Sequence, residues 1–223
     1  MTMSLLNRLA MLDTSAVSDA LDRLQLPGAL TSLHALSVPR RIAGQAITVQ
    51  LGCANGEGST RHLCTAAVDA SGPGSVIVVA HNGRVDVAGW GGILSLGAVL
   101  RHVEGVVIDG ACRDLDESRE LALPVYGRAA VPVTARGRIV EVAWNTPVQI
   151  DGLTVSPGDL VIADASGVVF VPQAHAERVI DIAEEVVLRE RAMSEAVRRG
   201  GQMVDIMGAK YEGLLQKQDI HEQ

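Results

Sequence analysis

The chain has 223 residues, enough for one large domain or two small ones with a well-buried core. Apolar residues make up 48% of it and charged residues 20%, a globular composition that argues against disorder. Because 26 acidic residues outnumber 19 basic ones, the formal charge of −7 repels phosphate backbones, and we expect no nucleic-acid partner.

Cysteine usage and hydropathy indicate a cytoplasmic protein. Cys53, Cys64 and Cys112 are odd in number and lack paired spacing, which favours neither a disulfide framework nor a structural zinc site. Polar residues interrupt the first 15 residues, which make a poor signal peptide. No stretch approaches the roughly 18 apolar residues of a membrane helix, so we expect no membrane partner.

Helix and strand signals alternate through the first half of the chain. The predicted elements are a capped helix from Thr14 or Ser15 to about 25, strand 45–51, helix 61–70, strand 75–80, helix 93–102, strand 105–109, helix 114–122 and strand 123–127. The run SVIVVA at 75–80 is apolar throughout, as in a strand covered on both faces. Alternation of this kind predicts an α/β layer.

The second half changes to short strands and turns. Short strands and turns are predicted over 131–135, 137–143, 147–150, 153–159 and 160–172, with tight turns at Asp151-Gly152 and Pro157-Gly158. A helix follows from 173 to about 199, because its apolar residues recur at helical spacing. No linker or repeat marks a boundary, so we expect a single domain over residues 1–223.

Several familiar signatures are absent. The glycine cluster at 89–92 is followed by Leu94 where GxGxxG requires glycine, and the chain has no P-loop. The six histidines never fall at metal-ligand spacing. These observations argue against a dinucleotide fold and a zinc enzyme.

One charged pair stands at the end of a predicted strand. The strand GVVID leads through Gly110 and Cys112 to Arg113-Asp114. In open α/β sheets, ligands bind beyond the carboxyl ends of strands, where a cation and a carboxylate can hold an oxyanion and Mg²⁺. Equally, Asp is favoured in a first helical turn and Arg-Asp pairs are common on surfaces.

The segment AGWGGILSLGA, residues 88–98, is the second candidate. Its glycines either expose successive backbone N–H groups at a helix start, as in a carboxylate pocket, or serve a turn that needs positive φ.

Together the two segments resemble one family. Gly91-x-x-Leu94, then 18 residues, then Arg113-Asp114, within WGGILSLGAVLRHVEGVVIDGACRD, resembles the signature of the RraA-like proteins. These include the class II 4-hydroxy-4-methyl-2-oxoglutarate aldolases and the regulator of ribonuclease E activity. TSAVSDALDRL, SGPGSVIVVA, PVTARGR, SPGDLVIADASGVVFVP and the terminal helix extend the likeness over nearly the whole chain.

The resemblance implies an α/β fold of the β/β/α phosphohistidine-swivelling type, with a long C-terminal helix. It also implies a homotrimer or homohexamer with active sites between subunits, a divalent metal (Mg²⁺ or Mn²⁺) and a small 2-oxo acid substrate.

By position, the resemblance assigns roles to six residues. Asp114 would hold the metal, and Arg113 would bind the substrate carbonyl oxygen and stabilise the developing enolate. Backbone amides of Gly91, Gly92, Ile93 and Leu94 would hold the substrate carboxylate.

Two features depart from the pattern or extend it. Gly92 stands where an acidic residue, which in the aldolases helps a water take the 4-hydroxyl proton, is expected. Glu190 on the terminal helix is a candidate replacement from a neighbouring subunit, or an ordinary solvated residue.

The sequence therefore predicts a metal-dependent carbon–carbon lyase that cleaves a 4-hydroxy-2-oxo acid to pyruvate or decarboxylates oxaloacetate. The alternative is a non-catalytic member that binds and inhibits an RNA-degrading enzyme. A quinone methyltransferase is rejected, because no glycine-rich loop for a methyl donor is present.

Overall fold

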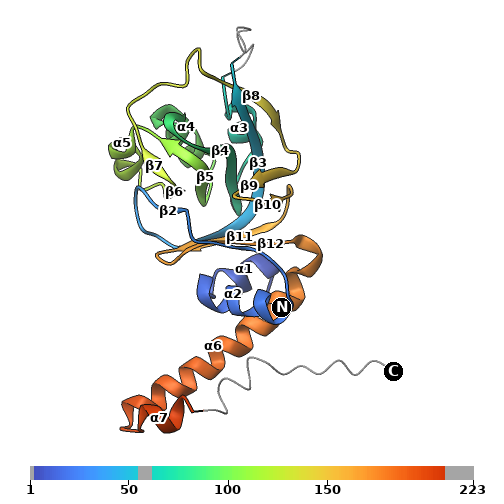
Figure 1. The fold of residues 1–223 in the computed structure, drawn as a ribbon, viewed down its shortest axis with the longest axis vertical. Coiled ribbons are helices and arrows are strands. Elements are labelled where there is room, and N and C mark those ends of the chain that lie inside the picture. The colour runs from blue at the N-terminus through green and yellow to red at the C-terminus, as the bar shows by residue number, and fades with distance from the viewer. Residues whose placement is uncertain (1–2, 55–61, 209–223) are drawn as a thin grey trace.

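A mixed sheet forms the body of the protein in the computed structural model, which describes residues 3–54 and 62–208. Ten strands make one sheet with the order β1-β12-β11-β3-β4-β5-β6-β2, with β7 beside β5 and β8 beside β3 (Figure 1). The strands are β1 (Ala29–Leu30), β2 (His34–Ala35), β3 (Ile42–Cys53), β4 (Ser75–Trp90), β5 (Gly105–Cys112), β6 (Val125–Gly127), β7 (Ala129–Ala130), β8 (Ile139–Trp144), β11 (Leu160–Asp164) and β12 (Gly167–Val171). A separate hairpin pairs β9 (Val148–Ile150) with β10 (Leu153–Val155).

The centre of the sheet is parallel. Strands β3, β4, β5 and β6 pair in parallel and are joined by the helices α3 (Thr65–Ala70), α4 (Gly92–Leu100) and α5 (Leu115–Glu120). Every residue of β5 is buried, as its apolar sequence predicts for a strand covered on both faces. The carboxyl ends of β4 and β5 consequently lie together, and α4 and α5 each begin there.

Helices from the two ends of the described chain pack together against the antiparallel edge. The helices α1 (Leu5–Leu9), α2 (Thr14–Arg23) and α6 (Ala176–Arg198) share an aliphatic cluster with β11 and β12. A 3₁₀ turn (Gln173–His175) precedes α6, and a short α7 (Met203–Ile206) follows it. In Figure 1, the distal half of α6 runs away from the sheet.

The mixed α/β class and the long C-terminal helix are confirmed. Among the boundaries, α2 is capped by Asp13 rather than by Thr14 or Ser15, because the Asp13 carboxylate accepts a hydrogen bond from Ala16 N. Helix α3 is shorter than the predicted 61–70, and residue 61 lies outside the described ranges. No described helix is long and apolar enough to cross a membrane.

The predicted strand at 131–135 is wrong. These residues are irregular and bridge two strands: Val131 N donates to Cys112 O, while Val133 O accepts from Ala88 N. Pro132 between them has no N–H to donate to a ladder. The segment therefore crosses the carboxyl ends of β4 and β5 as a loop, and this loop reaches the pocket described below.

Candidate active site

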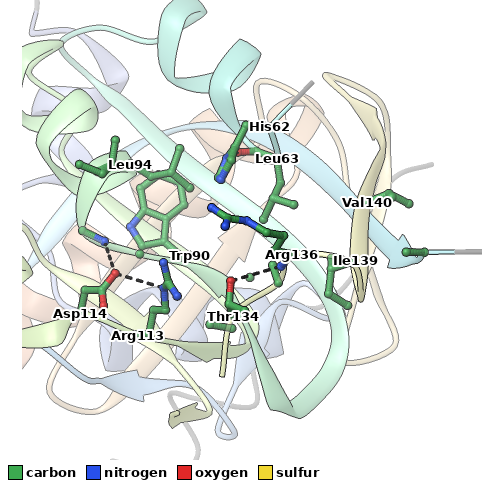
Figure 2. A pocket seen from close by; sticks show the side chains of 18 residues that line it. His62, Leu63, Trp90, Leu94, Arg113, Asp114, Thr134, Arg136, Ile139 and Val140 are labelled. Atoms are coloured by element: carbon green, nitrogen blue, oxygen red, sulfur yellow. Dashed lines mark hydrogen bonds and ion pairs between the residues drawn. The ribbon is translucent and has the colours of Figure 1, made fainter. Parts of the chain in front are cut away.

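A pocket of about 460 Å³ opens where β4 and β5 end (Figure 2). Its walls come from the end of β4, the first turn of α4, the residues after β5 and the loop that precedes β8. All six residues singled out from the sequence line it: Gly91, Gly92, Ile93, Leu94, Arg113 and Asp114. The parallel pairing of β4 with β5 explains why segments distant in the sequence meet here.

Arg113 and Asp114 form a close pair at the pocket wall. Arg113 Nε lies 3.2 Å from Asp114 Oδ2, and both side chains remain about one-third exposed. The Asp114 backbone is left-handed, with φ 57° and ψ 40°, a conformation that costs free energy for a residue with a Cβ. This conformation turns the chain sharply from β5 into α5, and Arg113 N is anchored on Trp90 O at 3.0 Å. Backbone conformation and hydrogen bonding therefore hold the pair in place, in addition to the attraction between the two charges.

The glycines at 91 and 92 allow the two strand ends to approach. A Cβ on Gly91 would lie 2.9 Å from Asp114 Oδ2, so a side chain there would displace the carboxylate. Gly92 N donates a hydrogen bond to the same oxygen at 3.0 Å. Of the amides expected to bind a substrate carboxylate, that of Gly92 is therefore already used. Those of Ile93 and Leu94 lie in the first turn of α4, where amides lack helical partners.

A second acidic residue, Glu117, lies against Gly92. A Cβ built on Gly92 would overlap the Glu117 carboxylate, with its Cδ only 2.6 Å away. A carboxylate does therefore lie beside Gly92, although it comes from α5 rather than from residue 92 itself. The signal was present as Asp114-x-x-Glu117, because residues three apart at a helix start lie on one face.

Buried hydroxyl groups join the two halves of the site beneath these charges. Trp90 Nε1 donates to Ser95 Oγ at 2.9 Å, and Ser95 Oγ lies 2.9 Å from Ser118 Oγ. Ser95 Oγ also donates to Gly91 O at 3.2 Å, and both serines are fully buried. A satisfied buried network of this kind fixes the elements that it connects, here β4, α4 and α5.

The opposite wall carries basic and polar side chains that sequence analysis did not single out. Arg136 and Thr134 come from the loop before β8, and His62 precedes α3. In Figure 2, Arg136 and His62 direct ring or guanidinium nitrogens towards the interior of the pocket, across from Arg113. No local sequence signal marked Arg136, which falls between the two predicted strands at 131–135 and 137–143.

The donor set suits a hard divalent cation. Asp114 and Glu117 place carboxylate oxygens beside the same glycine, and Mg²⁺ often binds through one or two carboxylates while keeping several waters. Within the described ranges, no three His, Cys, Asp or Glu side chains gather as a ligand group, so water or substrate would complete the coordination.

Glu190 lies outside this pocket lining. It is on α6, which packs against α1 and α2. Partial burial, together with the charges of Asp13 and Asp19, raises the pKa of Glu190. Any contribution of Glu190 to the site would have to come from another copy of the chain, and it stays a prediction.

Comparisons with known proteins agree with this fold and pocket. The RraA-like family, described as Aldolase/RraA, matches residues 14–170. The chain belongs to the RraA-like family. It is 33% identical to a Halalkalibacterium halodurans protein provisionally named a 4-hydroxy-4-methyl-2-oxoglutarate aldolase, over 82% of this chain and 86% of that protein.

Two solved structures are close. An uncharacterised Pseudomonas syringae protein superposes with a TM-score of 0.84 at 34% identity, covering 93% of this chain and 98% of that one. Streptomyces coelicolor RraAS2, described as an unusual member of the RNase ES inhibitor RraA family, superposes with a TM-score of 0.77 at 26% identity. The match covers 86% of this chain and 96% of that one. The chain covers 32% and 63% of the lengths of two other curated relatives, one from Legionella pneumophila and one from Methanocaldococcus jannaschii.

Proposed function

We propose that the protein is a divalent-metal-dependent carbon–carbon lyase that cleaves a 4-hydroxy-2-oxo acid to pyruvate and decarboxylates oxaloacetate. The observation that carries this proposal is that Arg113 and Asp114 line one pocket with the Gly91-Gly92 turn, while the Glu117 carboxylate packs against Gly92 from α5. The aldolase name of a 33% identical relative supports the same reaction class.

Substrate binding uses groups at the start of α4. The Ile93 and Leu94 amides accept the C1 carboxylate, since a helix N-terminus carries partial positive charge. Arg113 hydrogen-bonds the C2 carbonyl oxygen. Its Nε is engaged by Asp114, which leaves the terminal nitrogens of the guanidinium for the substrate.

Retro-aldol cleavage requires a base at the C4 hydroxyl. Glu117 takes that proton, directly or through a water. The C3–C4 bond then breaks, C4 leaves as a carbonyl product, and the electron pair moves through C3 to the C2 oxygen. Arg113 stabilises the resulting pyruvate enolate, and protonation at C3 gives pyruvate.

Decarboxylation of oxaloacetate produces the same enolate. The C3–C4 bond breaks, C4 leaves as CO₂, and the electron pair again reaches the C2 oxygen. No hydroxyl proton has to be removed, so Arg113 is needed and Glu117 is dispensable. The two reactions thus separate the roles of these residues.

Asp114 is the residue that would hold Mg²⁺ or Mn²⁺. Asp114 Oδ2 accepts from Gly92 N and contacts Arg113 Nε, which fixes the orientation of the carboxylate and leaves Oδ1 available to a ligand. A bound ion supplies Lewis-acid stabilisation of negative charge on the oxo acid.

A coupled assay for pyruvate tests the proposal. Purified protein should release pyruvate from oxaloacetate and from 4-hydroxy-4-methyl-2-oxoglutarate with Mg²⁺ or Mn²⁺, and release should stop in EDTA. Absence of metal-dependent turnover on both substrates would overturn the proposal.

The second candidate is a protein that inhibits an RNA-degrading enzyme. The likeness to RraAS2 of Streptomyces coelicolor favours it. It predicts that the chain slows cleavage of RNA by an RNase E-type endonuclease, and that Asp114→Ala leaves this inhibition unchanged. Metal-dependent lyase activity would not be expected of such a protein.

The proposed protein is a homotrimer or homohexamer located in the cytoplasm. On α4, Ile93, Leu96 and Leu100 form an exposed apolar stripe, with Ile93 83% exposed at the pocket rim. A second copy packed on this stripe would bury it and narrow the pocket mouth.

A further inference from the structure

The pocket extends well beyond the Arg113–Asp114 pair. Its volume of about 460 Å³ is far larger than a three-carbon 2-oxo acid needs. If C1 and C2 lie at α4 and Arg113, the remaining substrate points towards the wall formed by the loop before β8. The side chains on that wall therefore face the part of the substrate that distinguishes one 2-oxo acid from another.

Backbone hydrogen bonds hold this loop in place before any ligand binds. Val133 O accepts from Ala88 N at 3.0 Å, and Arg138 O accepts from Ala54 N at 2.9 Å. Between these anchors, Arg136 N donates to Thr134 Oγ1 at 3.3 Å, which leaves the Thr134 hydroxyl proton free to donate. A loop fixed at both ends presents Arg136 at little cost in entropy.

The charge balance on this wall is positive. Of the pocket lining residues, Asp114 is the one carboxylate among those described, and it already contacts Arg113. Arg136 forms no ion pair with any described residue, and His62 adds a second basic group nearby. The guanidinium is therefore available for an anion, and its planar fork fits a carboxylate.

We propose that Arg136 is a specificity-determining residue that binds a second carboxylate, at the far end of the 2-oxo acid from C1, with Thr134 donating a further hydrogen bond. The inference rests on the proposed function, because it takes the C1 end to be bound at α4. It selects dicarboxylic 2-oxo acids over analogues that end in a methyl group.

Binding of unreactive ligands tests the assignment without catalysis. Isothermal calorimetry with Mg²⁺ present compares 2-oxoglutarate with 2-oxopentanoate, which has a methyl group in place of the distal carboxylate. The native protein should bind 2-oxoglutarate at least about tenfold more tightly, equivalent to about 1.4 kcal/mol. Arg136→Gln should remove this preference, and Arg136→Lys should retain part of it.

Arg138→Gln is the matched control. It removes the same charge from the same loop, and Arg138 is absent from the pocket lining. The preference should survive in this variant. Equal loss in both variants would indicate a general charge effect and would overturn the assignment to Arg136.

Activity measurements distinguish failure of this inference from failure of the proposed function. Arg136→Gln should lower kcat/KM for 4-hydroxy-2-oxoglutarate at least about tenfold, mainly through KM, and leave 4-hydroxy-2-oxopentanoate unchanged. If the native protein releases pyruvate from both substrates with equal kcat/KM, the role of Arg136 is refuted and the lyase activity stands. No pyruvate from either substrate, with 2-oxoglutarate still preferred in calorimetry, would refute the lyase and keep the binding site.

Discussion

The carboxylate of Glu117 occupies the space that a side chain on Gly92 would fill. The two residues come from different helices, α4 and α5, whose starts are brought together by the parallel pairing of β4 with β5. A glycine that looks like a lost acid in the sequence is thus the residue that makes room for one. This relationship changes what substitutions at either position should do.

Gly92→Ala should displace Glu117 and depress retro-aldol cleavage. The added Cβ overlaps the carboxylate, so the Glu117 side chain has to move from its present position. Oxaloacetate decarboxylation should fall less, since it needs no base. Pyruvate release from 4-hydroxy-4-methyl-2-oxoglutarate and from oxaloacetate gives the ratio of the two activities. Gly72→Ala is the control, because a Cβ there meets nothing within 4 Å; unchanged retro-aldol activity in Gly92→Ala would refute the account.

Glu117→Gln removes the proton acceptor with little change in shape. General-base help is typically worth about 10² to 10⁴ in rate, so retro-aldol kcat should fall at least about 100-fold. Decarboxylation by the same preparation should stay within a few-fold. Glu120→Gln, an exposed substitution on the same helix, should alter neither rate. A parallel fall in both activities would instead place Glu117 in binding or folding.

Arg113→Lys separates shape from charge. Lysine keeps the positive charge but loses the planar fork that contacts Asp114 and the substrate oxygen together. Decarboxylation of oxaloacetate should lose at least about tenfold in kcat/KM, or about 1.4 kcal/mol of transition-state stabilisation. Arg101→Lys, in an exposed pair with Asp69, serves as the control. An unchanged kcat/KM would mean that Arg113 is structural.

Ser95→Ala tests the buried network beneath the site. It removes the acceptor of the Trp90 indole N–H, which is left buried without a partner. An unsatisfied buried group costs about 1–3 kcal/mol, so the free energy of unfolding measured with urea should fall by that amount. Ser194→Ala on the exposed part of α6 should change it by less than about 0.5 kcal/mol. Equal stabilities would show that the network does not hold these helices.

The sequence predicted those parts of the site that depend on local pattern. Arg113 and Asp114 were found because they follow an apolar strand, and the start of α4 because its glycines precede a helical pattern. Glu117 was missed although its i, i+3 spacing from Asp114 was readable. Arg136 could not be found locally, because its position depends on hydrogen bonds from Ala88 and Ala54 to its loop.

The fold, too, has parts that local sequence predicts and parts that tertiary contacts determine. Strands β4 and β5 were predicted from their apolar runs, although β4 extends to Trp90, well past the predicted end at residue 80. That extension is set by pairing, since Trp90 is in register with Cys112 at the end of β5. The failed strand at 131–135 has β-like residues, but Pro132 cannot donate to a ladder. Single hydrogen bonds to Cys112 and Ala88, on two different strands, take the place of continuous pairing and override the local preference of the segment.

Metal dependence of pyruvate formation tests the central claim most directly. Native protein and Asp114→Ala are each assayed with oxaloacetate in EDTA and after addition of excess Mg²⁺ or Mn²⁺, with circular dichroism to verify folding. Native activity should vanish in EDTA and return with metal, while folded Asp114→Ala should stay inactive in both. Full turnover by Asp114→Ala in EDTA would contradict the assignment of this pocket as a metal-dependent lyase site.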